Sequence, residues 1–206
     1  MSATAVQSLA LPVMEHFYTL QGEGAWAGTP AYFIRLGGCD VGCHWCDVKE
    51  SWPIDVHPSF EVEQMAAWWQ ATEAPLVVVT GGEPFMHNLE ALAEAIRASG
   101  RRAHIETSGT HPLTGRWDWV TFSPKKFKDP LPAFYPAAHE LKVVAYHKSD
   151  LPWALGHAQK VGPNCQLYIQ PEWDKRHHIT PLLIDFVKEH PRWRLSLQTH
   201  KYLHIP

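Results

Sequence analysis

The sequence is short of cysteine, of charge and of long apolar runs. Only four of its 206 residues are cysteines, and charged residues make up 19%. No apolar run approaches the roughly 20 residues that a transmembrane helix requires, which argues against a membrane span. The first residues, MSATAVQSLALPVM, have no basic region, so we expect no signal peptide and a cytoplasmic protein.

The sequence also has no excess of basic residues, no internal repeat and no low-complexity segment. Its formal net charge is −3, and 45% of its residues are hydrophobic. A surface with this charge does not bind nucleic acid or an anionic membrane as a whole, and the composition is that of a globular chain. We expect one domain, residues 1–206, because this length supports one core better than two.

Seven short runs rich in β-branched or aromatic residues, each bounded by Gly, Pro, Asn or Asp, predict strands. They are 31–36, 75–80, 102–107, 119–123, 140–144, 166–170 and 193–198. Helical patterns are found at 60–71, 88–100, 149–160 and 180–190. Asn88 suits an N-cap and Gly100 a C-terminal stop. Thr180 and Pro181 suit an N-cap followed by a first-turn proline.

Strands that alternate with helices predict an α/β fold with a mostly parallel sheet. A complete (β/α) barrel needs about 250 residues, so we expect a shortened, incomplete barrel. Functional residues in such sheets follow the carboxyl ends of the strands. GGCDVGCHWC, GGEP, SG and SPKK all stand there. The segment 124–139 contains four prolines, which indicates an ordered loop or a lid.

Three of the four cysteines, Cys39, Cys43 and Cys46, form a C-x3-C-x2-C loop. Thiolates bind iron–sulfur clusters or zinc. Three cysteines can hold three irons of a [4Fe-4S] cluster and leave the fourth iron open for a small molecule. The alternative is a structural zinc ion, which needs a fourth protein ligand such as Cys165 or a histidine. The spacing favours the open cluster and leaves both interpretations possible.

The cysteine loop, with its aromatic residue before Cys46, resembles the signature of the radical S-adenosylmethionine superfamily. Gly81, Gly82, Glu83 and Pro84 after VVVT resemble that superfamily's glycine-rich motif. The resemblance implies a [4Fe-4S] cluster that reduces S-adenosylmethionine, with the motif's backbone at the methionine amino group. On its own, the GGEP motif is typical of a simple turn.

Further segments resemble the 7-carboxy-7-deazaguanine synthase family over nearly the whole chain. They are FYTLQGEGAWAGTPAYFIRLGGC, VTGGEP, IETSGT, TFSPK and SLQTHKYLHIP. The resemblance implies a carbon–nitrogen lyase that converts 6-carboxy-5,6,7,8-tetrahydropterin to 7-carboxy-7-deazaguanine. In that reaction a radical removes hydrogen from C6 of the substrate, the ring contracts, ammonia leaves, and the hydrogen is returned. The product serves queuosine biosynthesis, a tRNA modification pathway, and other deazapurine routes.

The same resemblance implies two sets of site residues, in addition to the three cluster cysteines. The residues expected to contact S-adenosylmethionine are Trp45, Cys46, Asp47, Gly82, Glu83, Glu106, Ser108, Ser123, Pro124, Lys125 and Gln170. The residues expected to contact the substrate are Leu20, Gln21, Gly22, Glu23, Arg35, Thr80, His200 and Pro206. Glu23 and His200 are also candidates for proton transfer. Simpler roles remain open: a surface ion pair for Arg35, and a structural carboxylate for Glu106.

The sequence departs from the family at one position. Members place Thr or Ser after Cys-Asp, and the hydroxyl binds a magnesium ion, whereas this chain has Val48. Magnesium prefers oxygen ligands, so the ion is in doubt here, and we hypothesise that Lys49 supplies a positive charge instead. As partners we expect a pterin substrate, an electron donor such as flavodoxin or ferredoxin, and a second copy in a homodimer. The competing functions are a glycyl-radical activase and a zinc-stabilised RNA-binding module.

Overall fold

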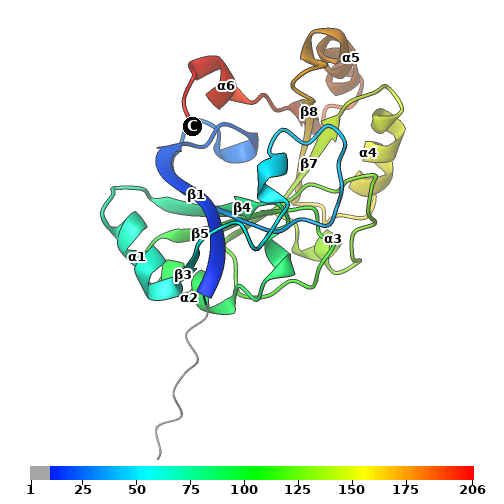
Figure 1. Cartoon of the computed structure of the whole chain (residues 1–206). Helices are drawn as coiled ribbons and strands as arrows, with labels where there is room; N and C mark the ends of the chain where they lie inside the picture. The colour runs from blue at the N-terminus through cyan, green and yellow to red at the C-terminus, as the bar shows by residue number, and fades with distance from the viewer. Residues whose placement is uncertain (1–9) are drawn as a thin grey trace, which may run out of the picture.

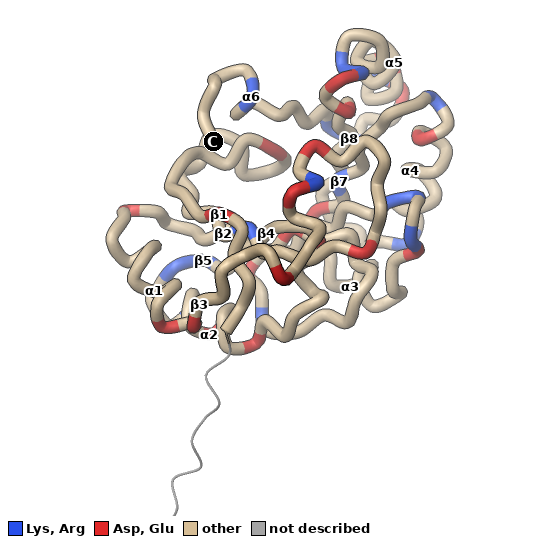
Figure 2. Tube along the Cα trace, in the orientation of Figure 1, with Lys and Arg blue, Asp and Glu red and all other residues tan. Residues whose placement is uncertain are grey.

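The computed structural model describes residues 10–206. Most of the segment considered above as a signal peptide, residues 1–9, therefore lies outside the described residues. No helix of the described part is both long and apolar enough to cross a membrane. Acidic and basic residues are both scattered over the trace (Figure 2), in keeping with the small net charge.

The fold is built on one nine-stranded sheet with the order β3-β1-β2-β4-β5-β6-β7-β8-β9 (Figure 1). The strands are β1 (Ala10–Leu20), β2 (Pro30–Leu36), β3 (Ser59–Glu61), β4 (Leu76–Gly81), β5 (Arg102–Thr107), β6 (Trp119–Phe122), β7 (Glu140–Ala145), β8 (Gln166–Pro171) and β9 (Trp193–Leu195). Every neighbouring pair from β2 to β9 is parallel, and β1 is antiparallel to both β2 and β3. The sheet does not close, which confirms the expected incomplete, mostly parallel barrel.

Helices follow the strands as the βαβ pattern requires. They are α1 (Val62–Gln70), α2 (Glu90–Ala98), α3 (Phe134–Ala137), α4 (Asp150–Ala158), α5 (Arg176–Glu189) and α6 (Thr199–Leu203), with short 3-10 helices η1 (Gly24–Trp26), η2 (Lys49–Ser51) and η3 (Pro84–Met86). Helix α2 contacts β5, α4 contacts β7, and α5 contacts β8 and β9. These helices cover the outer face of the curved sheet and leave its inner face to the loops (Figure 1).

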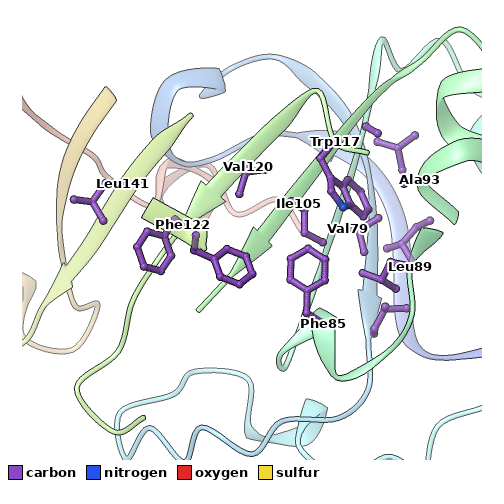
Figure 3. Packing of buried hydrophobic residues seen from close by; sticks show 14 of the residues in the cluster. Val79, Phe85, Leu89, Ala93, Ile105, Trp117, Val120, Phe122 and Leu141 are labelled. Carbon is purple, nitrogen blue, oxygen red and sulfur yellow. The ribbon is translucent and has the colours of Figure 1, made fainter. Parts of the chain in front are cut away.

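Successive side chains of a strand point to opposite faces of a sheet, and the core follows this alternation. Val79, Ile105 and Phe122 are fully buried against the helix layer, together with Phe85 of η3 (Figure 3). The inner face carries a small apolar cluster at its base, including Phe33, and is polar toward the carboxyl ends of the strands. The sheet therefore separates a dry outer core from a polar inner cavity.

The helix boundaries agree with the sequence at α2 and differ at α5. The prediction of Asn88 as the N-cap is wrong by one residue, because the N-cap of α2 is Leu89; Oδ1 of Asn88 still accepts a hydrogen bond from the Glu90 amide. Gly100 follows the helix with φ of +77°, as a C-terminal glycine does. The prediction of an N-cap at Thr180 is wrong, because α5 begins at Arg176 and Pro181 lies inside it. A proline near a helix start removes only one intrahelical hydrogen bond, so tertiary packing of the first turn can extend the helix past it.

The proline-rich segment 124–139 is the ordered loop that the sequence suggests. It contains α3, whose Phe134 is fully buried in the core. The amide of Leu131 donates to the carbonyl oxygen of Gly109, which ties the segment to the loop after β5. A segment anchored in the core by a buried aromatic ring is a fixed part of the fold rather than a mobile lid.

Candidate active site

A cavity of about 370 Å³ opens on the inner face, at the carboxyl ends of the parallel strands. It brings together residues from the first loop, the cysteine loop, the strand ends and the last residues of the chain. Of the expected contacts, the cavity is lined by Leu20, Gln21, Gly22, Glu23, Arg35, Cys39, Cys43, Trp45, Cys46, Asp47, Val48, Thr80, Gly82, Glu106, Ser108, Ser123, Lys125, Gln170, His200 and Pro206. Three expected residues do not line it: Lys49, Glu83 and Pro124.

The cysteine loop forms one wall of this cavity. Its backbone is fixed by the Gly38 amide, which donates to the Ser51 carbonyl oxygen at 2.7 Å, and by the Cys39 amide, which donates to the Trp52 carbonyl oxygen at 3.0 Å. Burial raises the pKa of the Cys39 thiol and raises that of Cys43 to about 11, and neighbouring thiols add to both effects. These thiols need the positive charge of bound metal to ionise.

The donor set fits an iron–sulfur cluster better than a zinc ion. Within residues 10–206, no three or more His, Cys, Asp or Glu side chains are arranged around a single metal ion. A cluster does not need such convergence, because each thiolate binds a different iron. Cys165 does not line the cavity, and its Sγ donates to the carbonyl oxygen of Gln166 at 3.7 Å. The described residues therefore offer three thiolates and leave one iron open.

The GGEP motif packs backbone to backbone against the cysteine loop. The Glu83 amide donates to the Gly38 carbonyl oxygen at 2.8 Å, and the Gly82 amide donates to Leu36 at 3.2 Å. A Cβ on Gly82 would lie 2.3 Å from the Gly38 carbonyl oxygen, so this close approach requires glycine. The carbonyl oxygen of Gly82 remains the part of its backbone that can meet the amino group of a ligand.

Glu83 has a structural role rather than the expected cofactor contact. Its carboxylate is fully buried and points into the protein. It accepts hydrogen bonds from the Phe85 amide, the Thr107 hydroxyl, and both the amide and the hydroxyl of Ser108. Four donors are enough to stabilise a buried carboxylate. Glu83 thereby holds the end of β5, including the cavity residue Ser108, in place.

The QGEG loop after β1 is held by side chains from the opposite side of the barrel. The Gly24 amide donates to Oγ of Ser196 at 2.9 Å, and the Ala25 amide donates to Glu140 at 2.9 Å. Both the amide and the hydroxyl of Thr199, the first residue of α6, donate to the Gly22 carbonyl oxygen at 2.9 Å. The loop is therefore fixed by hydrogen bonds as one side of the cavity and is not a free turn.

The side chains of this loop belong to a buried charge network. Nε2 of Gln21 donates to Oε1 of Glu106 at 2.9 Å, and the Lys142 ammonium pairs with Glu23 and, at 3.2 Å, with Glu106. Burial alone would raise the pKa of Glu23, but the Lys142 charge outweighs it and lowers that pKa to about 2. Glu23 is therefore ionised, which makes it an acceptor and not a proton donor near neutral pH.

Lys142 is one of the cavity residues that sequence reasoning missed, and Lys201 is another. Lys142 lines the cavity at the centre of β7 and is nearly fully buried. Burial acts to lower its pKa, but Glu106 and Glu23 outweigh this and raise it. The available signal is the alternation in ELKVV, where the charged residues Glu140 and Lys142 alternate with Leu141 and Val143 of the hydrophobic core. A lysine at an alternate position of a buried strand must face something other than the apolar core.

The cofactor side of the cavity holds the expected strand-end residues. Nζ of Lys125 donates to both the carbonyl oxygen and the hydroxyl of Ser123 at 2.6 Å, and burial lowers its pKa. Pro124 lies one step away, in a smaller adjoining cavity of about 210 Å³ that it shares with Trp45 and Lys125. The flat Trp45 ring thus borders both spaces.

Arg35 forms an ion pair and also lines the cavity. Its Nε donates to Glu15 at 2.7 Å, an ion pair whose carboxylate is 43% exposed, and its side chain also lines the cavity. The planar guanidinium has five donors, so the pair with Glu15 leaves donors for a carboxylate in the cavity.

The last residues of the chain fold over the QGEG loop, as Figure 1 shows for α6 and the C-terminus. His200 packs so closely on Gly22 that a Cβ there would lie 2.1 Å from Nδ1. Burial lowers the pKa of His200, so its ring is neutral near neutral pH. The Lys201 ammonium pairs with Asp47 of the cysteine loop at 2.5 Å. This segment joins the region after β9 to the QGEG loop after β1 and to the cysteine loop.

The described residues do not fit a magnesium ion at the expected place. Val48 lines the cavity and has no side-chain oxygen, and the carboxylate of the adjacent Asp47 is bonded to Lys201. Lys49, the suggested substitute charge, does not line the cavity, and its ammonium lies over the Trp52 ring at 5.9 Å. The cation that reaches this part of the cavity is Lys201.

Comparison with known proteins agrees with this site. Residues 33–128 match the family model of the Radical SAM superfamily. The chain is 52% identical over 197 residues to the 7-carboxy-7-deazaguanine synthase of Flavobacterium psychrophilum, covering 95% of this chain and 93% of that protein. It is 48% identical over 198 residues to the synthase of that name from Synechocystis, covering 96% and 95%. The crystal structure of QueE from Escherichia coli matches with a TM-score of 0.82 and 32% identity, over 91% of this chain and 93% of that one.

The open, mostly parallel barrel and the three cysteines at its cavity define a radical S-adenosylmethionine enzyme, which uses a [4Fe-4S] cluster and S-adenosylmethionine. The relatives extend over almost the full length of the chain, and more than one of them shares about half of its residues. The chain belongs to the 7-carboxy-7-deazaguanine synthase family.

Proposed function

We propose that this chain converts 6-carboxy-5,6,7,8-tetrahydropterin to 7-carboxy-7-deazaguanine with loss of ammonia, and that the chain acts as one domain. The observation that carries the proposal is the shared cavity. The cysteine loop lines it on one side, and the QGEG loop with the last residues lines it on the other. A cofactor at the cysteines and a flat substrate at the QGEG loop would therefore meet inside one cavity.

On the substrate side, the charges match a heterocycle that carries amino groups and a carboxylate. The ionised Glu23 accepts hydrogen bonds from the N–H groups of the pyrimidine edge, because charge-assisted bonds of this kind are short and strong. The free donors of Arg35 face the substrate carboxylate. The neutral ring of His200 can accept or pass a proton at one ring nitrogen.

On the cofactor side, Cys39, Cys43 and Cys46 hold the cluster, and the carbonyl oxygen of Gly82 meets the methionine amino group. The Trp45 ring borders the adenine. When bound, the cluster and S-adenosylmethionine supply a one-electron reduction and the abstraction of a hydrogen atom from the substrate. The contribution of the chain is orientation and the exclusion of water, since reactive intermediates must be kept from solvent.

The fixed substrate side of the cavity argues against the glycyl-radical activase. Such an enzyme must admit a loop of another protein, whereas hydrogen bonds between Thr199 and Gly22 hold α6 against the QGEG loop along this side of the cavity. The cavity of about 370 Å³ has to take S-adenosylmethionine as well, so it suits a small planar substrate better than a loop of another protein.

We also propose the partners and the location that the chemistry requires. Gly42 and His44 of the cysteine loop are exposed, so an electron donor such as flavodoxin or ferredoxin can approach the cluster. Free thiols that bind iron persist in a reducing compartment such as the cytoplasm. Exposed apolar residues on α5 and α6, among them Leu182 and Leu203, are available to a second copy in a homodimer, which sedimentation analysis would test.

The function is tested with anaerobically reconstituted, reduced protein. It is incubated with S-adenosylmethionine and the carboxypterin, and the products are identified by mass. Formation of 7-carboxy-7-deazaguanine and ammonia is expected, with no product from the matched Cys43→Ser variant. If the wild-type protein cleaves S-adenosylmethionine but leaves the carboxypterin unchanged, the proposed substrate is wrong.

A further inference from the structure

Lys142 lies at the meeting point of the two halves of the cavity. Its side chain is 5% exposed, and it pairs with Glu23, which is 15% exposed, and with Glu106, which is 19% exposed. The two carboxylates come from distant parts of the chain, the loop after β1 and the strand β5. One buried ammonium therefore contacts both the substrate wall and the cofactor wall.

These contacts form a closed ring. Lys142 pairs with Glu23, the Glu23 amide donates to Oε1 of Gln21 at 3.1 Å, Nε2 of Gln21 donates to Glu106, and Glu106 pairs with Lys142. A change in the position of one carboxylate must move the ammonium, the amide or both. The ring therefore provides a direct mechanical and electrostatic connection between Glu23 and Glu106.

The charge balance of the ring depends on Lys142. Two carboxylates in a buried site repel each other, and without a cation one of them takes up a proton. Removing one partner of a buried ion pair leaves an uncompensated charge, which costs far more than the loss of the contact itself. Lys142 thus decides whether Glu23 and Glu106 are both ionised and where they point.

We propose that Lys142 is a positioning residue that holds Glu23 toward the substrate and Glu106 toward the cofactor, so that the two ligands bind cooperatively. This inference rests on the proposed function. Binding of the carboxypterin at Glu23 fixes the ring, and S-adenosylmethionine then finds Glu106 already placed. By linkage, the cofactor raises the affinity for the pterin by the same factor.

The pH dependence gives a signature that a purely structural lysine would lack. The ionisable groups that face Lys142 and Glu23 from the surrounding elements are Asp47, Glu106, Lys125, Glu140 and His200. Without Lys142, burial is left to raise the pKa of Glu23, with His200 as the remaining nearby cation when it is protonated. Protonated Glu23 loses acceptor capacity, so the acid limb of kcat/KM moves to higher pH.

The test compares wild-type protein with Lys142→Met, Lys142→Arg and the exposed control Lys188→Met, all loaded with cluster. The affinity for S-adenosylmethionine is measured by equilibrium dialysis, with and without the carboxypterin, and kcat/KM is measured against pH. In wild type and Lys188→Met, the pterin should tighten cofactor binding. In Lys142→Met, we expect this coupling to vanish and kcat/KM to fall on the order of 100-fold. The acid limb of the kcat/KM profile should also move to higher pH. Lys142→Arg should restore part of the coupling and part of kcat/KM.

If Lys142→Met does not fold, the charge-balanced Lys142→Met/Glu23→Gln variant takes its place. It removes the cation together with one carboxylate, so we expect a folded, cluster-containing protein without coupling. Coupling that survives in either variant, or an acid limb that stays at the wild-type pH in Lys142→Met, overturns the role of Lys142 while the wild type remains active. A wild type that binds both ligands cooperatively but makes no product overturns the proposed function instead.

Discussion

Replacement of Gly82 by alanine tests the close packing of the GGEP motif on the cysteine loop. The added methyl group would lie 2.3 Å from the carbonyl oxygen of Gly38 and 2.6 Å from Cβ of Cys39. Non-bonded carbon atoms prefer separations of about 3.5–4.0 Å, so the two segments must move apart by about 1 Å. The nearest obstacle is backbone, and no side-chain rotation relieves it.

Overpacking of this kind costs about 1–3 kcal/mol. For a chain of this length, each kcal/mol lowers Tm by about 2–4 °C, so a cost in the middle of the range lowers Tm by about 4–8 °C. Because Cys39 lies at the point of contact, we also expect Gly82→Ala to hold clearly less iron and sulfide per chain than wild type. Both quantities are measured after identical anaerobic reconstitution.

Gly156→Ala is the matched control. Gly156 lies inside α4, and nothing is within 4 Å of a Cβ placed there. Alanine in a helix interior is favoured over glycine by about 1 kcal/mol, so this variant should melt at or above the wild-type temperature with full iron content. If Gly82→Ala matches Gly156→Ala in both measurements, the described contact between the two loops is refuted.

Three further predictions follow from the same structure. Cys43→Ser should lose the visible absorption of the cluster, whereas Cys165→Ser should keep it, since Cys165 lies outside the cavity; absorption spectra after reconstitution decide this. Glu83→Gln has one acceptor oxygen for donors that Glu83 satisfies with two, so we expect its free energy of unfolding, measured with urea, to fall by about 2–3 kcal/mol. A decrease smaller than the error of the measurement would contradict this prediction. Burial raises the pKa of Glu140 to about 7 from 4.5, so its native carboxyl keeps a proton that the unfolded chain has released, and stability falls as pH rises across that interval. Glu140→Gln should remove this part of the decline in Tm between those pH values. The buried His104, whose pKa is lowered to about 3, has the opposite effect on stability in both proteins, so the quantity to measure is the difference in Tm between wild type and Glu140→Gln. A difference in Tm that does not change with pH would contradict the prediction.

The parallel strands could be predicted from the sequence because both of their faces are shielded. Helices cover the outer face, and the inner face lies inside the barrel. β5 matches the predicted 102–107, and β4, at Leu76–Gly81, is displaced by one residue from the predicted run. Strands of this kind are continuous apolar runs between turn residues, which need no tertiary information to find. The cysteine spacing likewise predicted a loop whose three thiols face one cavity.

β1 could not be predicted in this way. A register shift between Val13 and Glu15 interrupts its pairing with β2, and the buried residues before the shift give way to exposed ones after it. Such a bulge breaks the two-residue period on which a strand prediction depends. Pro12 within the strand also argued against it, although Pro12 accepts a hydrogen bond from the Gly37 amide with its carbonyl oxygen.

The site was predicted where residues stand in family motifs and missed where only the fold brings them together. Lys142 occupies an ordinary position in a strand, and its partners Glu23 and Glu106 are 119 and 36 residues away in the sequence. Its importance comes from the sheet order, which places β7 opposite the QGEG loop. Conversely, the motif residue Glu83 faces away from the cavity, because a motif position does not fix the direction of its side chain.

The seam between the QGEG loop after β1 and the segment after β9 differs from the strand pairs of the sheet. Elsewhere neighbouring strands share a backbone ladder, whereas Thr199 and Ser196 join this seam to Gly22 and Gly24 through a few isolated hydrogen bonds. Openings that break a few such bonds require less free energy than openings that break a ladder. We therefore expect local opening of the barrel at this seam, and amide hydrogen exchange should be fastest there among the cavity walls.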